Sequence, residues 1–114
     1  MLLWLLACTG APAADSGACQ ERDPPLTWAS FGQGWMGKHC VGCHSSLLPE
    51  AERNGAPVGI DLDTWEDAVA WGPRIAARSL GDAPTMPPGG GPSVEERRLL
   101  AEWLECDVLP AENP

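Results

Sequence analysis

Tyrosine is absent from this 114-residue sequence, phenylalanine occurs once, and positive charge is scarce. Seven lysine and arginine residues stand against 16 aspartate and glutamate residues, so the formal net charge is −9 at pH 7. A surface of this sign repels phosphate groups. Long hydrophobic runs are absent too, because Met1–Ala7 is far shorter than the roughly 20 residues that cross a bilayer, and later stretches contain proline, glycine or charge. We therefore expect no nucleic-acid binding and no transmembrane helix.

The sequence also has few residues that could form a standalone enzyme site. His39 and His44 are the only histidines, and no serine has a spare base beside it. The three glycines at 89–91 are not followed by lysine, so they indicate a loop rather than a phosphate cradle. We expect the protein not to be an enzyme and to have no small-molecule substrate.

Glycine and proline together make up 25 of the 114 residues, or about 22%. This fraction is below the roughly 25–30% found in disordered low-complexity chains. The length suits one small globular domain. Six tryptophans provide bulky anchors, but aliphatic side chains are few. We therefore expect something other than side chains to help fill the core.

The run Cys40-Val41-Gly42-Cys43-His44 is a C-x-x-C-H motif, which is typical of covalent haem attachment. Two thiols three positions apart on a helical turn can each add to one vinyl group of the porphyrin. The next residue, His44, then lies under the iron as the proximal ligand. The motif predicts one covalently bound haem c.

Two other kinds of site use a C-x-x-C pair. A structural zinc site needs four ligands and usually a second C-x-x-C or H-x3-5-H pair, whereas Cys19 and Cys106 are each alone and distant. His39 is next to Cys40 and points in a different direction from the helix. A thioredoxin-like redox pair needs a βαβ context, which the chain lacks. A zinc-stapled structural module stays open as an alternative that would give a colourless protein.

Together with Thr85-Met86-Pro87-Pro88 and a final helix that carries Trp103, the motif resembles the class I monohaem cytochrome c family. The chain is particularly similar to small bacterial cytochrome c-like domains that end in a Trp-Leu-x-Cys segment. The resemblance covers about residues 27–107. It implies an all-α fold, a small helical domain wrapped around a covalently bound haem, with His44 and Met86 as the axial ligands of the iron.

Among the three methionines, Met86 is the best candidate for the sixth ligand. Met1 lies at the start of the chain, and Met36 precedes Cys40 by one helical turn. Met86 lies in the proline-rich segment 84–92, which is extended because proline fixes φ and lacks an N–H. A thioether ligand favours ferrous iron and closes the sixth coordination position. The alternative is that Met86 fills the core.

The N-terminus indicates export. Leu5-Leu6-Ala7-Cys8 resembles a bacterial lipobox, in which the cysteine becomes the lipidated first residue of the mature protein. Cys8 could instead be an incidental residue of an ordinary cleaved signal. We expect a bacterial periplasmic or cell-envelope location, with the membrane reached only through the lipid.

We expect the chain to divide into four parts: a short or truncated lipoprotein signal at residues 1–7, a flexible tether and N-terminal arm at 8–26, a cytochrome c-like domain at 27–107, and a tail at 108–114.

Cys19 and Cys106 flank the domain of residues 27–107. In an oxidising compartment, two remaining thiols at opposite ends of a domain whose terminal helices meet are candidates for a disulfide. Two separate free thiols are the alternative. A bond between them would close a long loop and stabilise the fold by about 4 to 5 kcal/mol in the chain-entropy model.

Two helices are expected on either side of an irregular segment at 45–59. The first spans 28–38 with Thr27 as its N-cap, and the second begins with a capping box formed by Asp63 and Glu66. Gly72-Pro73 is expected to break the second helix, with a further piece over 74–80.

The last helix follows Ser93, which has Glu96 three residues later. Its expected apolar stripe consists of Val94, Leu99, Leu100, Trp103 and Leu104. The resemblance implies that this helix crosses the first one, and we expect Trp103 to lie over Gly34.

The expected function is the transfer of single electrons between redox-partner proteins. A partner steered by charge would present a basic docking face to this acidic chain, and salt would slow its association. Arg74 and Arg78 share a helix face and could pair with haem propionates, with Glu66 or with solvent. Two alternatives remain: an open-site haem protein that binds a gas or peroxide, and a haem subunit of a dehydrogenase complex.

Overall fold

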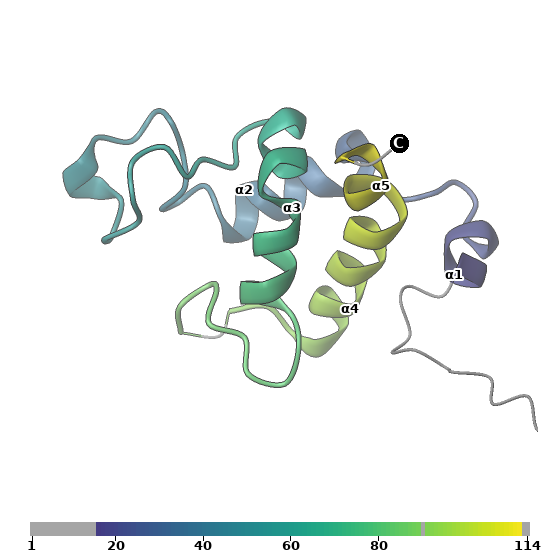
Figure 1. The fold of residues 1–114 in the computed structure, drawn as a ribbon. Helices are drawn as coiled ribbons and strands as arrows, with labels where there is room; N and C mark the ends of the chain where they lie inside the picture. Colours follow the sequence, from purple (N-terminus) through teal and green to yellow (C-terminus); the bar gives the residue numbers. More distant parts are fainter. Residues whose placement is uncertain (1–15, 90, 113–114) are drawn as a thin grey trace, which may run out of the picture.

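The computed structural model describes residues 16–89 and 91–112. These residues form helices joined by turns and loops, with no β-strand among them, so the prediction of an all-α fold is confirmed for this part of the chain (Figure 1). The elements, in chain order, are α1 (Ser16–Glu21), the π-type turn η1 (Trp28–Gly32), α2 (Gln33–His39), the 3-10 turn η2 (Glu50–Glu52), α3 (Trp65–Ser79), α4 (Val94–Trp103), the π-type turn η3 (Leu104–Val108) and α5 (Leu109–Glu112).

The first and last expected helices begin where the sequence predicts. Thr27 accepts a hydrogen bond from the backbone N–H of Ser30 at 3.1 Å, and Ser93 accepts one from that of Glu96 at 3.1 Å. In each case the side chain of the third helical residue accepts a hydrogen bond from the backbone N–H of the cap residue, which completes a capping box.

The start and length of α3 differ from the prediction. The N-cap is Thr64 with Asp67, one residue later than expected. The helix also continues through Pro73 to Ser79. A β-carbon at Gly72 would lie 3.0 Å from Cγ1 of Val108, so η3 packs closely along this part of α3. This packing outweighs the one backbone hydrogen bond that proline removes.

The core lies between α2, α3, α4 and η3. Its buried side chains are Trp35, Met36, Leu62, Ala68, Ile75, Leu100, Trp103, Leu104 and Val108. Trp103 is fully buried, and its ring centroid lies 5.9 Å from that of Phe31 and 6.2 Å from that of Trp28.

The contact of Trp103 with the first helix differs from the prediction by two residues. A β-carbon at Gly32 would lie 2.3 Å from Cζ2 of Trp103, whereas nothing lies within 4 Å of the corresponding point at Gly34. The crossing helices therefore meet at Gly32. Val94 was expected in the apolar stripe but is 76% exposed, because it begins α4 at the end away from the core.

The C-terminal helical segment extends beyond the expected end of the domain. It continues from α4 through η3 to Glu112, and Val108 is fully buried against α3. Residues just after Asp107 therefore belong to the packed core.

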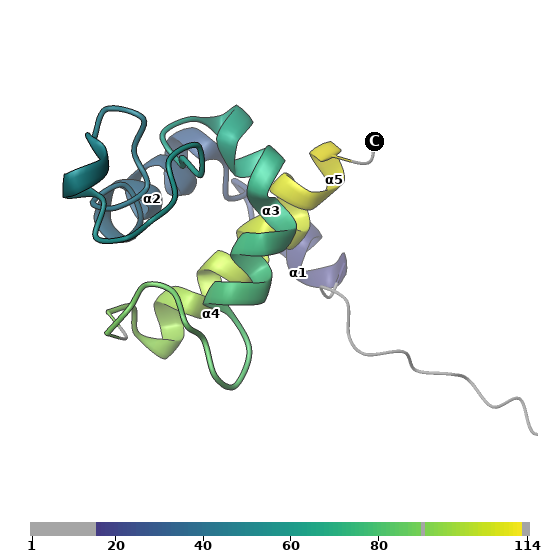
Figure 2. The same cartoon turned by 60° about the vertical axis from the view of Figure 1, so that its left-hand side comes forward.

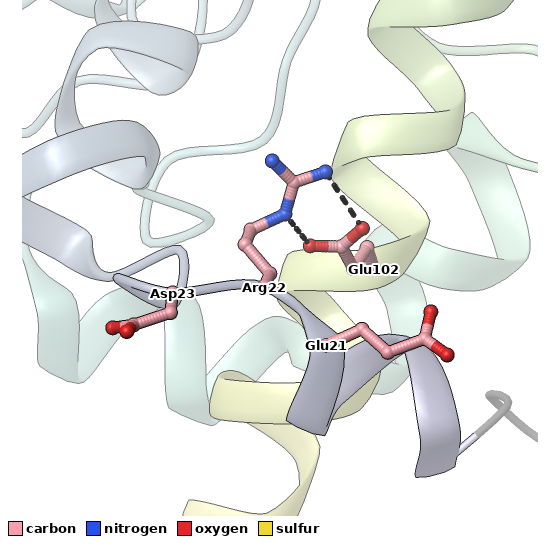
Figure 3. A pocket seen from close by; sticks show the side chains of 4 residues that line it. All are labelled: Glu21, Arg22, Asp23 and Glu102. Atoms are coloured by element: carbon pink, nitrogen blue, oxygen red, sulfur yellow. Dashed lines mark hydrogen bonds and ion pairs between the residues drawn. The ribbon is translucent and has the colours of Figure 1, made fainter.

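The N-terminal arm is held against α4 and η3. Cys19 and Cys106 lie at disulfide distance, with their Cα atoms 5.5 Å apart. Arg22 forms a two-pronged ion pair with Glu102, with Nη2 at 3.0 Å from Oε1, at the edge of a hollow lined by Glu21, Arg22, Asp23 and Glu102 (Figure 3). The guanidinium in this hollow is already paired, so the contact fastens the arm.

Two long loops project from the same side of α3. One connects α2 to α3 and carries the C-x-x-C-H motif at its start, and the other connects α3 to α4 and carries Met86 (Figures 1 and 2). Within the described residues, no helix is long and apolar enough to span a bilayer.

Candidate cofactor-attachment site

The C-x-x-C-H motif forms one tight turn at the end of α2. Cys40 is the C-cap of this helix, and its carbonyl oxygen accepts backbone hydrogen bonds from Cys43 at 3.1 Å and His44 at 2.9 Å. The thiols of Cys40 and Cys43 are free and half-buried. The structure thus brings together the two cysteines and the histidine that the sequence singles out.

Burial has a marked effect on one thiol of this turn. Loss of hydration, aided by the neighbouring Cys43, raises the pKa of Cys40 to about 12. Thiol–disulfide exchange in thioredoxin-like proteins relies on a cysteine of lowered pKa. The environment of Cys40 is the opposite, and the chain around it is helical rather than βαβ.

The ring of His44 is oriented by a backbone carbonyl. Its Nδ1 lies 2.9 Å from the carbonyl oxygen of Ile60. Because a carbonyl oxygen can only accept, Nδ1 must carry the proton in this contact, and in the neutral ring Nε2 then has a lone pair available for a metal. The carbonyl oxygen of His44 itself accepts from the N–H of Leu62 at 2.8 Å, which fixes the backbone of this residue.

Arg53 holds together the loop that supplies the Ile60 carbonyl. Its side chain is 1% exposed, and it donates to the carbonyl oxygens of Ser45, Ala56, Pro57 and Ile60. Its Nη1 also lies 2.9 Å from Oδ1 of Asp61. Sequence reasoning missed Arg53, because an arginine inside a turn-rich segment has no periodic pattern that marks it as buried.

Hydrogen bonds also tie the start of the same loop to the approach to α3. Oδ2 of Asp63 accepts from the backbone N–H of Ser46 at 2.7 Å. Burial alone would raise the pKa of Asp63, but hydrogen bonds from Ser45 and Ser46 outweigh it and lower the pKa. Asp63 thus remains an acceptor that holds the loop beside His44.

Met86 lies on the other loop, and its backbone is anchored at both ends. Its N–H donates to the carbonyl oxygen of Arg78 at 2.9 Å, and its own carbonyl oxygen accepts from Nη1 of Arg97 at 3.1 Å. Arg97 also donates to the carbonyl of Ser79. The Met86 side chain is 38% exposed, and among the described residues no hydrogen bond joins this loop segment to His44.

A polar contact links α2 to the start of α4 near these loops. The nearly buried ring of His39 packs on Trp35, with 4.6 Å between ring centroids, and its Nε2 lies 2.7 Å from Oε2 of Glu96. Lys38 pairs with the same carboxylate at 3.3 Å. His39 is thus engaged in helix packing and is not directed toward the thiols with His44.

The remaining candidate residues have separate positions. Arg74 lies over the ring of Trp71, with Cζ 5.8 Å from the centroid, while Arg78 is exposed and contributes its carbonyl to the Met86 loop. A role of either side chain toward propionates stays a prediction. Cys8 and the lipobox lie outside the described residues.

The donor set fits a covalently attached haem. Two free thiols stand three positions apart in one turn, and the adjacent imidazole is held through Nδ1, as in histidines that bind a metal through Nε2. Met86, which has a thioether, belongs to the α3–α4 loop, and this loop projects from the same side of α3 as the loop that begins with the C-x-x-C-H turn (Figures 1 and 2). The described residues contain no cluster of three or more His, Cys, Asp or Glu side chains suited to a bare metal ion.

Comparisons of this chain with protein-family models, with curated proteins and with solved structures found no match, so its functional assignment depends on the site itself.

Proposed function

We propose that the protein is an exported monohaem c-type cytochrome that transfers single electrons between redox-partner proteins. The observation that carries the proposal is the turn at 40–44, with two free thiols and an imidazole whose Nδ1 is tied to the carbonyl of Ile60. These are the groups that covalent haem attachment and proximal ligation require.

When bound, the haem supplies a one-electron Fe(III)/Fe(II) couple. Cys40 and Cys43 would hold the haem through thioether bonds, and His44 would supply a nitrogen ligand to the iron. The hydrogen bond to Ile60 keeps the imidazole in one orientation and one tautomer, so little rearrangement accompanies electron transfer. The chain thus supplies a fixed ligand frame rather than a reacting group.

Met86 is the proposed sixth ligand. Its thioether would favour the ferrous state and close the iron to external ligands. The backbone contacts to Arg78 and Arg97 support this role, because they fix the point from which the side chain extends while leaving the side chain itself free to turn.

The proposed setting is the bacterial periplasm or cell envelope, with the protein anchored through a lipid on Cys8 and stapled by a Cys19–Cys106 disulfide. The Cα separation of 5.5 Å supports the pairing, since disulfides commonly have this spacing. The net charge of −9 favours a partner with a basic docking face, and such an association would slow as salt rises.

One observation favours an alternative, a haem protein with an open sixth position that binds a gas or peroxide. The Met86 side chain is 38% exposed and belongs to a loop separate from the His44 turn. If the Met86 thioether does not bind the iron, a coordination position would be available to small molecules.

Optical spectra of the protein matured in a bacterial periplasm with haem-attachment machinery distinguish these functions. The proposal predicts the weak long-wavelength band of ferric iron bound by methionine sulfur, and a reduced spectrum that does not change with carbon monoxide. Met86→Ala should lose the band and bind carbon monoxide. The matched control is Met36→Leu, a conservative change of a buried core methionine, which should keep the band.

A wild-type spectrum that lacks this band and shifts with carbon monoxide would favour the open-site alternative. A protein that matures without colour would contradict both haem functions.

A further inference from the structure

Arg53 is the one buried charged side chain among the described residues. Burying a guanidinium is costly unless its donors are satisfied. Here Nη2 donates to the carbonyl oxygens of Pro57 at 2.9 Å and Ile60 at 3.0 Å, and Asp61 supplies a counter-charge. The loop between α2 and α3 is thus wrapped around a single cation.

One of these acceptors is shared with the candidate iron ligand. The carbonyl oxygen of Ile60 accepts from Nη2 of Arg53 at 3.0 Å and from Nδ1 of His44 at 2.9 Å. A carbonyl oxygen has two lone pairs, so both donors can be satisfied at once. The position of this oxygen, and with it the orientation of the imidazole, therefore depends on Arg53.

The shared carbonyl also has an electronic consequence. A positively charged donor draws electron density from the Ile60 oxygen, which makes it a weaker acceptor for the His44 proton. The imidazole then has less anionic character and donates less charge to a metal at Nε2. A nearby cation also favours Fe(II) over Fe(III), because Fe(II) has the lower positive charge. Both effects therefore favour the reduced state of the iron.

We propose that Arg53 is a positioning residue that acts through the Ile60 carbonyl on His44 and shifts the haem iron toward the reduced state. Asp61 partly offsets this effect through its negative charge. The inference rests on the proposed function, since it concerns the potential of a haem bound to His44.

The test is a spectroelectrochemical titration of the matured full chain and four variants. Arg53→Gln removes the charge but keeps a side chain that can donate to a carbonyl, and Asp61→Asn removes the counter-charge. Arg98→Gln and Glu66→Gln are matched controls, because each removes one charge of the same sign from an exposed position.

Mutation of a residue that hydrogen-bonds to a metal ligand typically changes metal affinity or activity by 10- to 100-fold. We expect Arg53→Gln to lower the equilibrium constant for reduction by about tenfold, which is about 59 mV for one electron. Asp61→Asn should shift it in the opposite direction. The two controls should change it by less than about twofold, because exposed charges are screened. In the NMR spectrum of the ferrous protein, the His44 Nδ1 proton should move downfield in Arg53→Gln as its hydrogen bond strengthens.

The inference is overturned if Arg53→Gln keeps the wild-type helical circular dichroism and attached haem but shifts the potential no more than Arg98→Gln. If Arg53→Gln does not fold, Asp61→Asn decides: a potential that rises more than in Glu66→Gln supports the inference, and equal shifts overturn it. A wild-type protein that attaches no haem would instead refute the proposed function, which is a distinct result.

Discussion

Gly32 provides a sensitive test of how the terminal helices cross. In Gly32→Ala, the new β-carbon would lie 2.3, 2.6 and 2.8 Å from three atoms of the Trp103 ring, where an unstrained carbon contact is about 3.5–4.0 Å. Trp103 is fully buried, and its ring is packed against Trp28, Phe31 and Trp65. The ring cannot move aside without disturbing these neighbours.

The magnitude follows from two opposing effects. Overpacking of a well-filled core costs about 1–3 kcal/mol, and the close contacts at Trp103 place this case at the upper end. Replacing a helical glycine by alanine recovers up to about 1 kcal/mol. The net expectation is a loss of about 2 kcal/mol in the free energy of unfolding, or a melting temperature about 10 °C lower for a domain of this size.

Gly34 is the matched control. It lies two residues after Gly32, in the first turn of α2, and nothing is within 4 Å of its β-carbon position. Gly34→Ala should therefore raise the melting temperature by about 5 °C through helix propensity alone. Thermal unfolding followed by far-ultraviolet circular dichroism measures both variants. The opposite pattern, with Gly34→Ala destabilising and Gly32→Ala neutral, would refute the observed crossing and favour a contact of Trp103 with Gly34.

Two further predictions concern the arm and the contact between α2 and α4. A Cys19→Ser/Cys106→Ser double variant should lose about 4 kcal/mol of unfolding free energy. In the wild-type protein, alkylation without reductant followed by mass spectrometry should detect no label on these two cysteines. Labelled wild-type cysteines would argue against the pairing. The hydrogen bond from His39 lowers the pKa of Glu96 to about 2 from its ordinary 4.5. The ionised Glu96 therefore stabilises the folded protein fully above pH 4.5, and this contribution is lost as the pH falls toward 2. Melting temperatures of wild-type protein should thus fall more steeply over this range than those of Glu96→Gln, and parallel curves would contradict the assignment.

Local sequence patterns predicted the helix starts well. Thr27 and Ser93 cap helices because a hydroxyl with a polar residue three positions later satisfies two exposed N–H groups within one turn. Such an interaction depends only on neighbours in the chain. The cap of α3 was displaced by one residue because Asp63 and Thr64 are both good caps, and Asp63 instead accepts from Ser46 in the preceding loop.

Tertiary contacts explain most of what the sequence could not predict. Pro73 does not end α3, because Gly72 packs closely against Val108 of η3. The local sequence pattern does not reveal this contact. Likewise, several glycines in the first helix could accept an aromatic ring, and the register that places Trp103 over Gly32 depends on the whole helix crossing.

The candidate site was predictable only in part. The spacing of Cys40, Cys43 and His44 within one turn follows directly from the motif. Arg53 could not be found in this way, because its burial depends on four carbonyl groups that converge only when the loop is folded.

The mass of the matured chain under denaturing conditions tests the central claim most directly. A covalently attached haem remains on the chain after unfolding, so we expect the wild-type protein to carry the added mass of one haem. The Cys40→Ser/Cys43→Ser variant, matured in the same way, should carry none. A wild-type chain with the mass of the polypeptide alone would contradict the account.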